Sequence, residues 1–296
     1  MESISVLSNA KINLFFAING IHSDGFCAVS SILLPVDFGD SMTFSLQKNT
    51  SPKGLEIFQH SPLKFPQKNN TIIRAVELFC EQTGIRNFSL RVDVGKKIPI
   101  GSGFGGGSSN AICTLKALNQ FYNFPLSEEY LTSLAKKIGA DCSFFIKNSP
   151  QLASGRGEIL SPLPIDFGQN ITNYSVLLFC PDFSISTQWA YDQFRQNPTF
   201  YPDAKTAIQR LLAASEYKKF VYNSFQDLVL KHYPKMKALF SELQNRGHTP
   251  CLTGSGSGCF IIHRDKNFLE SVRSIILEYL PAPQLLAMAT FKHQFE

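Results

Sequence analysis

The sequence predicts an α+β protein, in which strands and helices mix without the strict strand–helix alternation of a parallel sheet. Three observations carry this prediction. Residues 4–16 alternate as a strand does, residues 71–83 repeat with helical period, and a glycine-rich loop at 101–107 joins a strand to a helix. With 296 residues, the chain is long enough to form one large domain or two domains of ordinary size.

The first strand, at residues 4–16, places two polar side chains on one face. Ile12 and Leu14 point one way, whereas Lys11 and Asn13 share the opposite face. Taken alone, a lysine on such a strand is more often a surface residue than a catalytic one. Lys11 becomes a candidate catalytic residue only when it is considered together with the other motifs of the chain.

The later elements follow from the same periodicities and from turn residues such as Asn-Gly and Asp-Gly. Strands are expected near 27–36, 41–47, 88–94, 174–180 and 284–292, with a strand–loop–strand at 249–263. Helices are expected at 71–83, 108–122, 127–138, 187–195, 204–215, 224–246 and 266–279. Gly84 and Gly139 are positioned to end two of these helices. The Pro/Gly-containing stretch 149–168 indicates a boundary between domains at 1–160 and 161–296.

Composition narrows the class of protein. A hydrophobic content of 44% with 17% charged residues is typical of a globular protein. Apolar runs such as 176–180 are far too short to span a bilayer, so no membrane association is expected. The N-terminus has no basic, apolar or Arg-rich targeting pattern. A cytoplasmic location is therefore the expectation, and the oligomeric state is left open.

The cysteines, histidines and net charge indicate a reduced protein that binds small anions. The seven cysteines include no Cys-x-x-Cys pair, and several lie inside apolar runs. The six histidines are scattered, so a dedicated zinc site is not expected. A net charge of +5 suits anionic small substrates. No basic cluster indicates a nucleic-acid partner.

The segment Ile98-Pro-Ile-Gly-Ser-Gly-Phe-Gly-Gly-Gly-Ser-Ser-Asn-Ala111 is the strongest functional feature. Five glycines in seven positions let an anion approach the backbone N–H groups. Ser108 and Ser109 are expected to cap a helix whose N-terminus adds a partial positive charge. A phosphate-binding loop is therefore predicted in preference to a flexible linker.

Three other phosphate loops do not fit this segment. Gly101 to Gly106 spells the dinucleotide pattern G-x-G-x-x-G, but a second helix follows Pro125 where a strand with an acidic residue should come. A Walker A loop ends in Gly-Lys-Ser/Thr, and this loop has no such lysine. The tripeptides His-Arg-Asp (263–265) and Asp-Phe-Gly (37–39 and 166–168) do occur, but both copies of Asp-Phe-Gly precede His-Arg-Asp, whereas protein kinases have the opposite order.

The remaining pattern, Pro-x-x-x-Gly-Phe-Gly-Gly-Gly-Ser-Ser, resembles the ATP-binding loop of the GHMP kinase superfamily. The resemblance implies ATP as phosphoryl donor, with Mg²⁺ accompanying it and no dedicated carboxylate cluster for the metal. It implies a GHMP kinase fold, with an N-terminal domain like the second domain of ribosomal protein S5 and a ferredoxin-like C-terminal domain. The implied ATP-binding residues are Pro99, Gly101, Ser102, Gly103, Phe104, Gly105, Gly106, Gly107, Ser108, Ser109 and Asn110.

Six further segments resemble the 4-diphosphocytidyl-2-C-methyl-D-erythritol kinase family, in family order. They are Asn9–Phe16, Gly20–Phe26, Gly139-Ala-Asp-Cys-Ser-Phe-Phe145, Gly155-Arg-Gly-Glu158, the Ser-Thr-x-x-Ala-Tyr stretch ending at Tyr191, and the late glycine loop Leu252–Gly258. The implied reaction is phosphorylation of the substrate's 2-hydroxyl in non-mevalonate isoprenoid precursor synthesis.

The resemblance also implies residue roles. Asp141 accepts or orients the hydroxyl proton, and Lys11 holds Asp141 and the developing charge. Asn13 and Thr187 contact the acceptor substrate. Whether Asp141 is a true base stays open, because a loose transition state needs little early deprotonation. The late glycine loop is either a tight connection between strands or a direct contact to substrate.

This chain departs from the family where the cytosine is recognised. The family's turn tyrosine is Phe26 here, which keeps a stacking face, and the histidine that follows is Cys27. A thiol is a weak hydrogen-bonding group, so less sharp discrimination of cytosine is expected, testable with Cys27→His. Tyr191 is expected to stack on the other face of the base. The alternatives are a homoserine- or mevalonate-type GHMP kinase, or a non-catalytic nucleotide-binding homologue.

Overall fold

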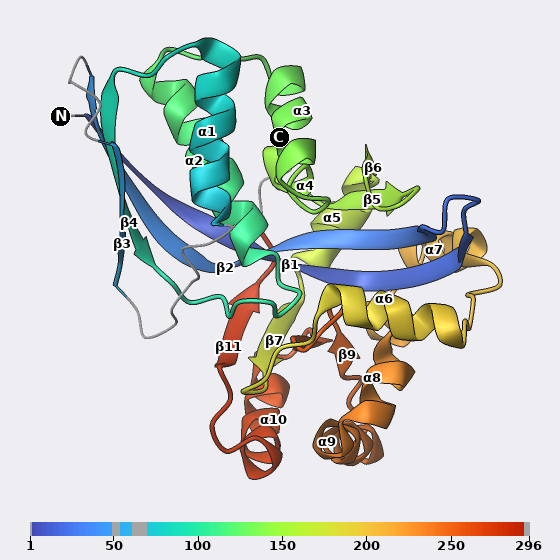
Figure 1. Ribbon diagram of the computed structural model, residues 1–296. Helices are drawn as coiled ribbons and strands as arrows, with labels where there is room; N and C mark the ends of the chain where they lie inside the picture. Colours follow the sequence, from blue (N-terminus) through green and yellow to red (C-terminus); the bar gives the residue numbers. More distant parts are fainter. Residues whose placement is uncertain (1, 49–53, 61–69, 293–296) are drawn as a thin grey trace. The chain divides into compact units, whose positions relative to one another are not determined.

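The computed structural model describes residues 2–48, 54–60 and 70–292 and contains mixed strands and helices (Figure 1). The contacts divide the chain into two interleaved units. Unit 1 comprises Met1–Ala10, Phe38–Ile100 and Gly105–Asn148, and unit 2 comprises Lys11–Asp37, Gly101–Phe104 and Ser149–Glu296. The boundary expected at residue 160 stays a prediction.

The sheet of unit 1 is centred on the second half of the long strand β2 (Cys27–Lys48). Strands β1 (Glu2–Ile21) and β2 (Cys27–Lys48) both contribute residues to the two units. In unit 1, β2 pairs antiparallel with β4 (Phe88–Gly95), and β4 pairs in parallel with β3 (Gly54–Gln59). The two strands expected at 27–36 and 41–47 are therefore parts of one strand, and β3 was not predicted.

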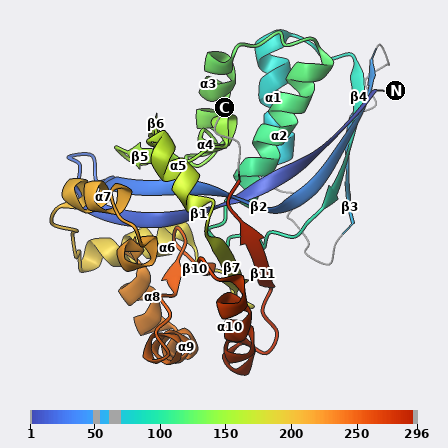
Figure 2. The ribbon, with the colours of Figure 1, turned by 180° about the vertical axis from the view of Figure 1, so that it is seen from behind.

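The helices of unit 1 begin and end largely where the sequence places them. They are α1 (Thr71–Thr83), α2 (Gly106–Phe121), α3 (Glu128–Ile138) and the short α4 (Phe144–Lys147). Asn70 caps α1 by accepting from the Ile72 N–H, and Gly84 ends the helix with a φ of 73°. Helices α1 and α2 pack side by side in both views (Figures 1 and 2).

Unit 2 contains the first half of β2, the second half of β1 and a separate antiparallel sheet. Strand β8 (Tyr222–Asn223) runs parallel to β1, and β5 (Gln151–Ser154) pairs with β2 and with β6 (Ile159–Pro162). The separate sheet has the order β11-β7-β10-β9. Its strands are β7 (Ser175–Cys180), β9 (Cys251–Leu252), β10 (Cys259–His263) and β11 (Leu285–Thr290).

The helices of unit 2 correct one prediction. The single helix expected at 224–246 is wrong, because α8 (Gln226–His232) and α9 (Pro234–Asn245) are separate. Pro234 has no N–H to continue the earlier helix, but its fixed φ suits the first position of the next one. The other helices are α5 (Ile165–Ile171), α6 (Thr187–Gln196), α7 (Ala204–Leu212), the 3₁₀ turn η1 (Tyr217–Phe220) and α10 (Lys266–Tyr279).

Packing in unit 2 produces a core around the separate sheet. Helix α10 packs on β7, β10 and α9. Phe225 stacks on Phe16 of β1 with ring centroids 5.4 Å apart, and both rings are buried. Among the helices that the structure describes, none has the length and apolar character needed to cross a bilayer.

Candidate active site

The second half of the glycine-rich loop forms the N-terminus of α2 in unit 1. Helix α2 starts at Gly106, and its N-cap is Gly105 in the left-handed conformation, with a φ of 76°. The expected serine caps are therefore wrong, because Ser108 and Ser109 already lie in the first turn. The first N–H groups of a helix have no partner within the helix, so this terminus remains suited to an anion.

Two of the predicted loop residues are buried in unit 1. The Ser8 hydroxyl lies 2.8 Å from Ser109 Oγ and 2.6 Å from Asn110 Oδ1. Ser109 and Asn110 are 2% and 4% exposed. These contacts fix the start of α2 against β1, so both side chains have a structural role in addition to the ATP contact predicted for them.

A buried ion pair lies beneath the loop. Lys96 Nζ is 2.5 Å from Asp40 Oδ2, and the two side chains are 3% and 0% exposed. Asp40 Oδ1 also accepts the backbone N–H groups of Lys97 and Ile98, each at 2.8 Å. A Cβ atom on Gly106 would lie 3.0 Å from Lys96 Nζ and 2.9 Å from Ile98 Cγ2. Only glycine fits there without displacing the pair.

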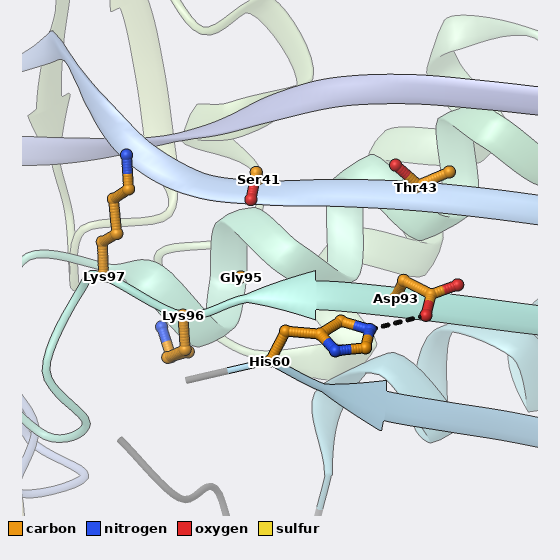
Figure 3. Close-up of a pocket in the computed structure, with 7 residues that line it drawn as sticks. All are labelled: Ser41, Thr43, His60, Asp93, Gly95, Lys96 and Lys97. Atoms are coloured by element: carbon orange, nitrogen blue, oxygen red, sulfur yellow. Dashed lines mark hydrogen bonds and ion pairs between the residues drawn. The ribbon is translucent and has the colours of Figure 1, made fainter. Parts of the chain in front are cut away.

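A hollow of about 480 Å³ in unit 1 opens beside this pair (Figure 3). Ser41 and Thr43 of β2 and Asp93 and Gly95 of β4 line it, together with the residues His60, Lys96 and Lys97. His60 Nε2 lies 2.7 Å from Asp93 Oδ1. Hydrogen bonds from Arg91, then from His60, lower the pKa of Asp93 to about 2. The hollow therefore combines a fixed carboxylate with two lysines at one end.

Asp141 lies in unit 1 just after α3, two residues beyond Gly139, and is exposed. The neighbouring Cys142 is buried. Burial raises the pKa of the Cys142 thiol to about 11, and Ser108, the first serine of the phosphate loop, has a smaller lowering effect on this pKa. The thiol therefore stays protonated near neutral pH.

Lys11 and Asn13 lie on the same face of β1 in unit 2, as predicted. Lys11 Nζ donates to Asn13 Oδ1 at 2.6 Å, and both side chains are buried. Asn13 Nδ2 donates to Ser31 Oγ at 2.8 Å, and the Thr253 hydroxyl donates to Asn13 Oδ1 at 3.1 Å. Lys11 belongs to unit 2 and Asp141 to unit 1, so contact between them stays a prediction.

The two glycine loops pack against each other within unit 2. The Lys11 N–H donates to Phe104 O at 2.9 Å, and the Gly258 N–H donates to Ser102 O at 2.9 Å. Gly103 has a φ of 78°, and a Cβ atom there would lie 2.1 Å from Thr253 O. The late glycine loop thus has a clear packing role, and its contact with a substrate stays a prediction.

The residues predicted to recognise a base also lie in unit 2. Phe26 is 53% exposed, and the Arg156 guanidinium carbon lies 4.3 Å from its ring centroid. Arg156 also pairs with Asp24 in the same turn. Tyr191 is half-buried and meets Phe225 edge-on, with centroids 4.9 Å apart.

Cys27 and Thr187 each interact with a residue that the sequence analysis did not select. Cys27 is buried, and Arg195 of α6 is the charged side chain that acts on its thiol. Burial raises the pKa of the Cys27 thiol, and Arg195 partly opposes this. Thr187 Oγ1 lies 2.9 Å from Ser255 Oγ of the late loop.

Four residues of these clusters were missed by sequence reasoning. Asp40 and Thr253 meet their partners across 56 and 240 positions of the chain, and no local pattern indicates such pairs. Arg195 carries a usable signal, because it follows Tyr191 by one helical turn. Arg156 lies inside the Gly155-Arg-Gly-Glu158 segment, in which the glycines and the glutamate, and not the arginine, match the family motif.

Within the described ranges, no group of three or more His, Cys, Asp or Glu side chains could hold a metal ion. The described residues provide a helix N-terminus suited to an anion, buried lysines and an exposed carboxylate.

Comparison with known proteins agrees with this arrangement. Residues 70–149 match the GHMP kinases N terminal domain. A 4-diphosphocytidyl-2-C-methyl-D-erythritol kinase from Gloeobacter violaceus is 32% identical over 93% of this chain and 91% of the relative. The Thermotoga maritima enzyme of the same name is 31% identical over 88% and 92%.

Solved structures show the same fold. A crystal structure of 4-(cytidine 5'-diphospho)-2C-methyl-D-erythritol kinase has a TM-score of 0.77 and 25% identity, covering 97% of this chain and 99% of that one. A homoserine kinase from Cytophaga hutchinsonii has a TM-score of 0.75 at 16% identity, covering 99% and 96%, and shows the fold alone. The predicted GHMP kinase fold of the α+β class is confirmed, and the chain belongs to the 4-diphosphocytidyl-2-C-methyl-D-erythritol kinase family.

Proposed function

We propose that this protein transfers the γ-phosphoryl group of ATP to the 2-hydroxyl of 4-diphosphocytidyl-2-C-methyl-D-erythritol, in non-mevalonate isoprenoid precursor synthesis. The observation that carries the proposal is the full-length likeness to kinases of that name, combined with intact chemistry. Lys11, Asn13, Asp141 and the glycine-rich loop lie in the segments whose sequence resembles the motifs of that family.

The part of the ATP site that holds the adenosine is proposed to lie in unit 1, whereas the predicted loop residues Gly101–Phe104 belong to unit 2. The hollow lined by His60, Asp93 and Lys96 is of a size suited to a small ligand and would hold the adenosine. The chain then runs from Lys96 through Ile98 directly into the phosphate loop, so the phosphates would follow the backbone towards the N-terminus of α2. There the N–H groups and the helix dipole favour negative charge.

The acceptor half uses Lys11, Asn13 and Asp141. Asp141 would accept or orient the proton of the attacking hydroxyl, and the Lys11 ammonium would offset negative charge on the transferring group. Asn13 orients Lys11 at 2.6 Å. Mg²⁺ is proposed to arrive with ATP and to neutralise its phosphates.

Recognition of the cytidine end is assigned to unit 2. The exposed ring of Phe26 offers one stacking face, and Tyr191 offers the other. Thr187, beside Ser255 of the late glycine loop, is proposed to contact the middle of the substrate. The seven free cysteines fit the reducing environment of the cytoplasm, the location proposed for the protein.

The proposal is tested by ADP release with three acceptors: the cytidine substrate, homoserine and mevalonate. Turnover with the cytidine substrate alone is the expected result. Turnover with either of the other acceptors would replace the proposed substrate. A protein that binds ATP and turns over none of them would be a non-catalytic homologue.

The variant Asp141→Asn tests the acceptor chemistry. We expect kcat to fall about 100-fold or more with ATP binding retained, because general-base and orienting groups contribute on this scale. Asp166→Asn, which changes an exposed aspartate on α5, is the matched control and should leave kcat unchanged. Equal effects of the two substitutions would refute the role of Asp141.

A further inference from the structure

The late glycine loop places one side chain in the polar cluster around Lys11. Thr253 lies at the start of this loop, directly after β9, and its side chain is fully buried. Its hydroxyl accepts the backbone N–H of Asn13 at 3.0 Å and donates to Asn13 Oδ1 at 3.1 Å. Both residues belong to unit 2. A single hydroxyl therefore makes two hydrogen bonds to one residue of β1, across 240 positions of the chain.

The hydrogen bonds around Asn13 determine which end of its amide faces Lys11. Ser31 Oγ donates its only proton to Phe15 O at 2.8 Å, so it can only accept from the Asn13 side chain. The nitrogen Nδ2 must therefore face Ser31 Oγ, and these two atoms lie 2.8 Å apart. The oxygen Oδ1 then faces the Lys11 ammonium at 2.6 Å and the Thr253 hydroxyl. An amide turned end for end would place its N–H₂ group against the ammonium, donor against donor.

Asn223 of β8 holds the segment that carries Thr253. Its Nδ2 atom donates to Leu252 O at 3.0 Å and to Gly254 O at 2.8 Å, which are the carbonyl groups on either side of Thr253. The Asn223 side chain is itself buried. The segment passes close to the lysine, because a Cβ atom on Gly254 would lie 3.6 Å from Lys11 Nζ. The backbone on both sides of Thr253 is thus fixed, and its hydroxyl has a defined position.

We propose that Thr253 is a positioning residue for phosphoryl transfer and acts on Lys11 through the side-chain amide of Asn13. This inference rests on the proposed function, in which the Lys11 ammonium offsets negative charge on the transferring group. The three side chains are buried, and a buried polar group that loses its partner is costly, so loss of the Thr253 hydroxyl would shift the Asn13 amide. A catalytic group misplaced by about 1 Å can lower the rate about 100-fold. The late glycine loop therefore contributes to the rate through a hydrogen bond, whether or not it touches the substrate.

The experiment measures kcat and the KM values for ATP and the cytidine substrate in two variants of Thr253. Valine removes the hydroxyl and serine keeps it. We expect Thr253→Val to lower kcat about 10- to 100-fold and to change each KM by less than about threefold, whereas Thr253→Ser should keep kcat within about threefold of the unaltered enzyme. Ser224→Ala is the matched control, because Ser224 Oγ accepts the Ile18 N–H further along the same strand at 2.9 Å. It should leave kcat unchanged.

A double-mutant cycle separates this positioning role from a merely structural one. If Thr253 acts through Asn13, Thr253→Val should lower kcat by less than about twofold in a protein that already carries Asn13→Ala. Two independent effects would multiply instead, and that result would overturn the inference. A fall in kcat that Ser224→Ala matches, or that Thr253→Ser shows to the same extent as Thr253→Val, would overturn it as well.

Hydrogen exchange of the Asn13 side-chain amide, followed by NMR, measures the positioning without any substrate. This amide is buried and donates to Ser31, so its exchange should be slow in the unaltered protein. Thr253→Val should speed the exchange about tenfold or more, and Ser224→Ala should leave it within about twofold. Equal exchange rates in the two variants would contradict the inference. Absence of turnover in the unaltered protein would instead refute the proposed function, and the exchange rates distinguish these two failures.

Discussion

Replacement of Asp40 by asparagine tests how the buried ion pair supports the phosphate loop. The side chain of Asp40 is fully buried, and its carboxylate faces the Lys96 ammonium at 2.5 Å. Asparagine keeps an oxygen for the N–H groups of Lys97 and Ile98. It removes the negative charge, and its amide N–H₂ would face another donor.

The expected loss of stability has two bounds. Breaking one partner of a buried ion pair costs about 3–5 kcal/mol. Lys96 can also lose its proton, which removes the unpaired charge. Deprotonation costs about 1.36 kcal/mol for each unit by which the pH lies below the ordinary lysine pKa near 10.4. The loss of stability cannot exceed this cost. The limit is about 4.6 kcal/mol at pH 7 and about 1.9 kcal/mol at pH 9. Burial lowers the pKa of Lys96, and the negative charge of Asp40 opposes this effect. Because the variant lacks that charge, we expect Lys96 to lose its proton there.

The assay is urea-induced unfolding of the two proteins at pH 7 and pH 9. We expect Asp40→Asn to lower the free energy of unfolding by about 3–4.5 kcal/mol at pH 7 and by less than about 2 kcal/mol at pH 9. The double variant Asp40→Asn/Lys96→Met, which removes both charges, should be more stable than Asp40→Asn alone at pH 7. A loss that is the same at both pH values, or a double variant less stable than Asp40→Asn, would refute the reasoning.

Two further predictions concern Asp93 and Gly103. The pKa of Asp93 lies at about 2, below its ordinary value of 3.8, so its ionised form stabilises the fold above pH 4 and this contribution is lost as the pH falls towards 2. Because the side chain is 22% exposed, Asp93→Asn should cost about 1 kcal/mol at pH 6 and almost nothing at pH 2 in urea unfolding. Gly103→Ala, with its Cβ 2.1 Å from Thr253 O, should lower stability by about 2 kcal/mol or more and raise KM for ATP. Gly247→Ala is the control, because its φ of 79° is similar but nothing lies within 4 Å; equal melting temperatures for the two variants would show that the close contact is unimportant.

Local features of the fold were predictable because they depend on neighbouring residues. The end of α1 at Gly84 and the start of α3 at Ser127 follow from capping, which acts within four residues. The helix break at Pro234 is a local signal of the same kind, because proline has no N–H to continue the earlier helix. The start of α2 was misplaced by two residues because Gly105 takes the cap position in a left-handed conformation.

The candidate site was predictable where one segment carries its own chemistry, and not where two distant segments meet. The glycine-rich loop and the Lys11–Asn13 face are read from single segments. The Thr253 hydroxyl reaches Asn13 across 240 positions, and the Asp40 carboxylate reaches Lys96 across 56. These partners decide burial and charge at the site, and they depend on packing that sequence periodicity does not describe.

The phosphate loop has no lysine of its own, and two lysines from other segments supply positive charge in different ways. Lys96 is buried against a carboxylate, so its charge is largely cancelled at short range, and its main effect is to fix the segment that leads into the loop. Lys11 donates to the amide oxygen of Asn13 at 2.6 Å, and this neutral acceptor orients the ammonium group. A buried charge interacts strongly with an anion, because little water screens it. These contacts support the roles proposed for the two lysines, which are positioning for Lys96 and charge stabilisation during phosphoryl transfer for Lys11.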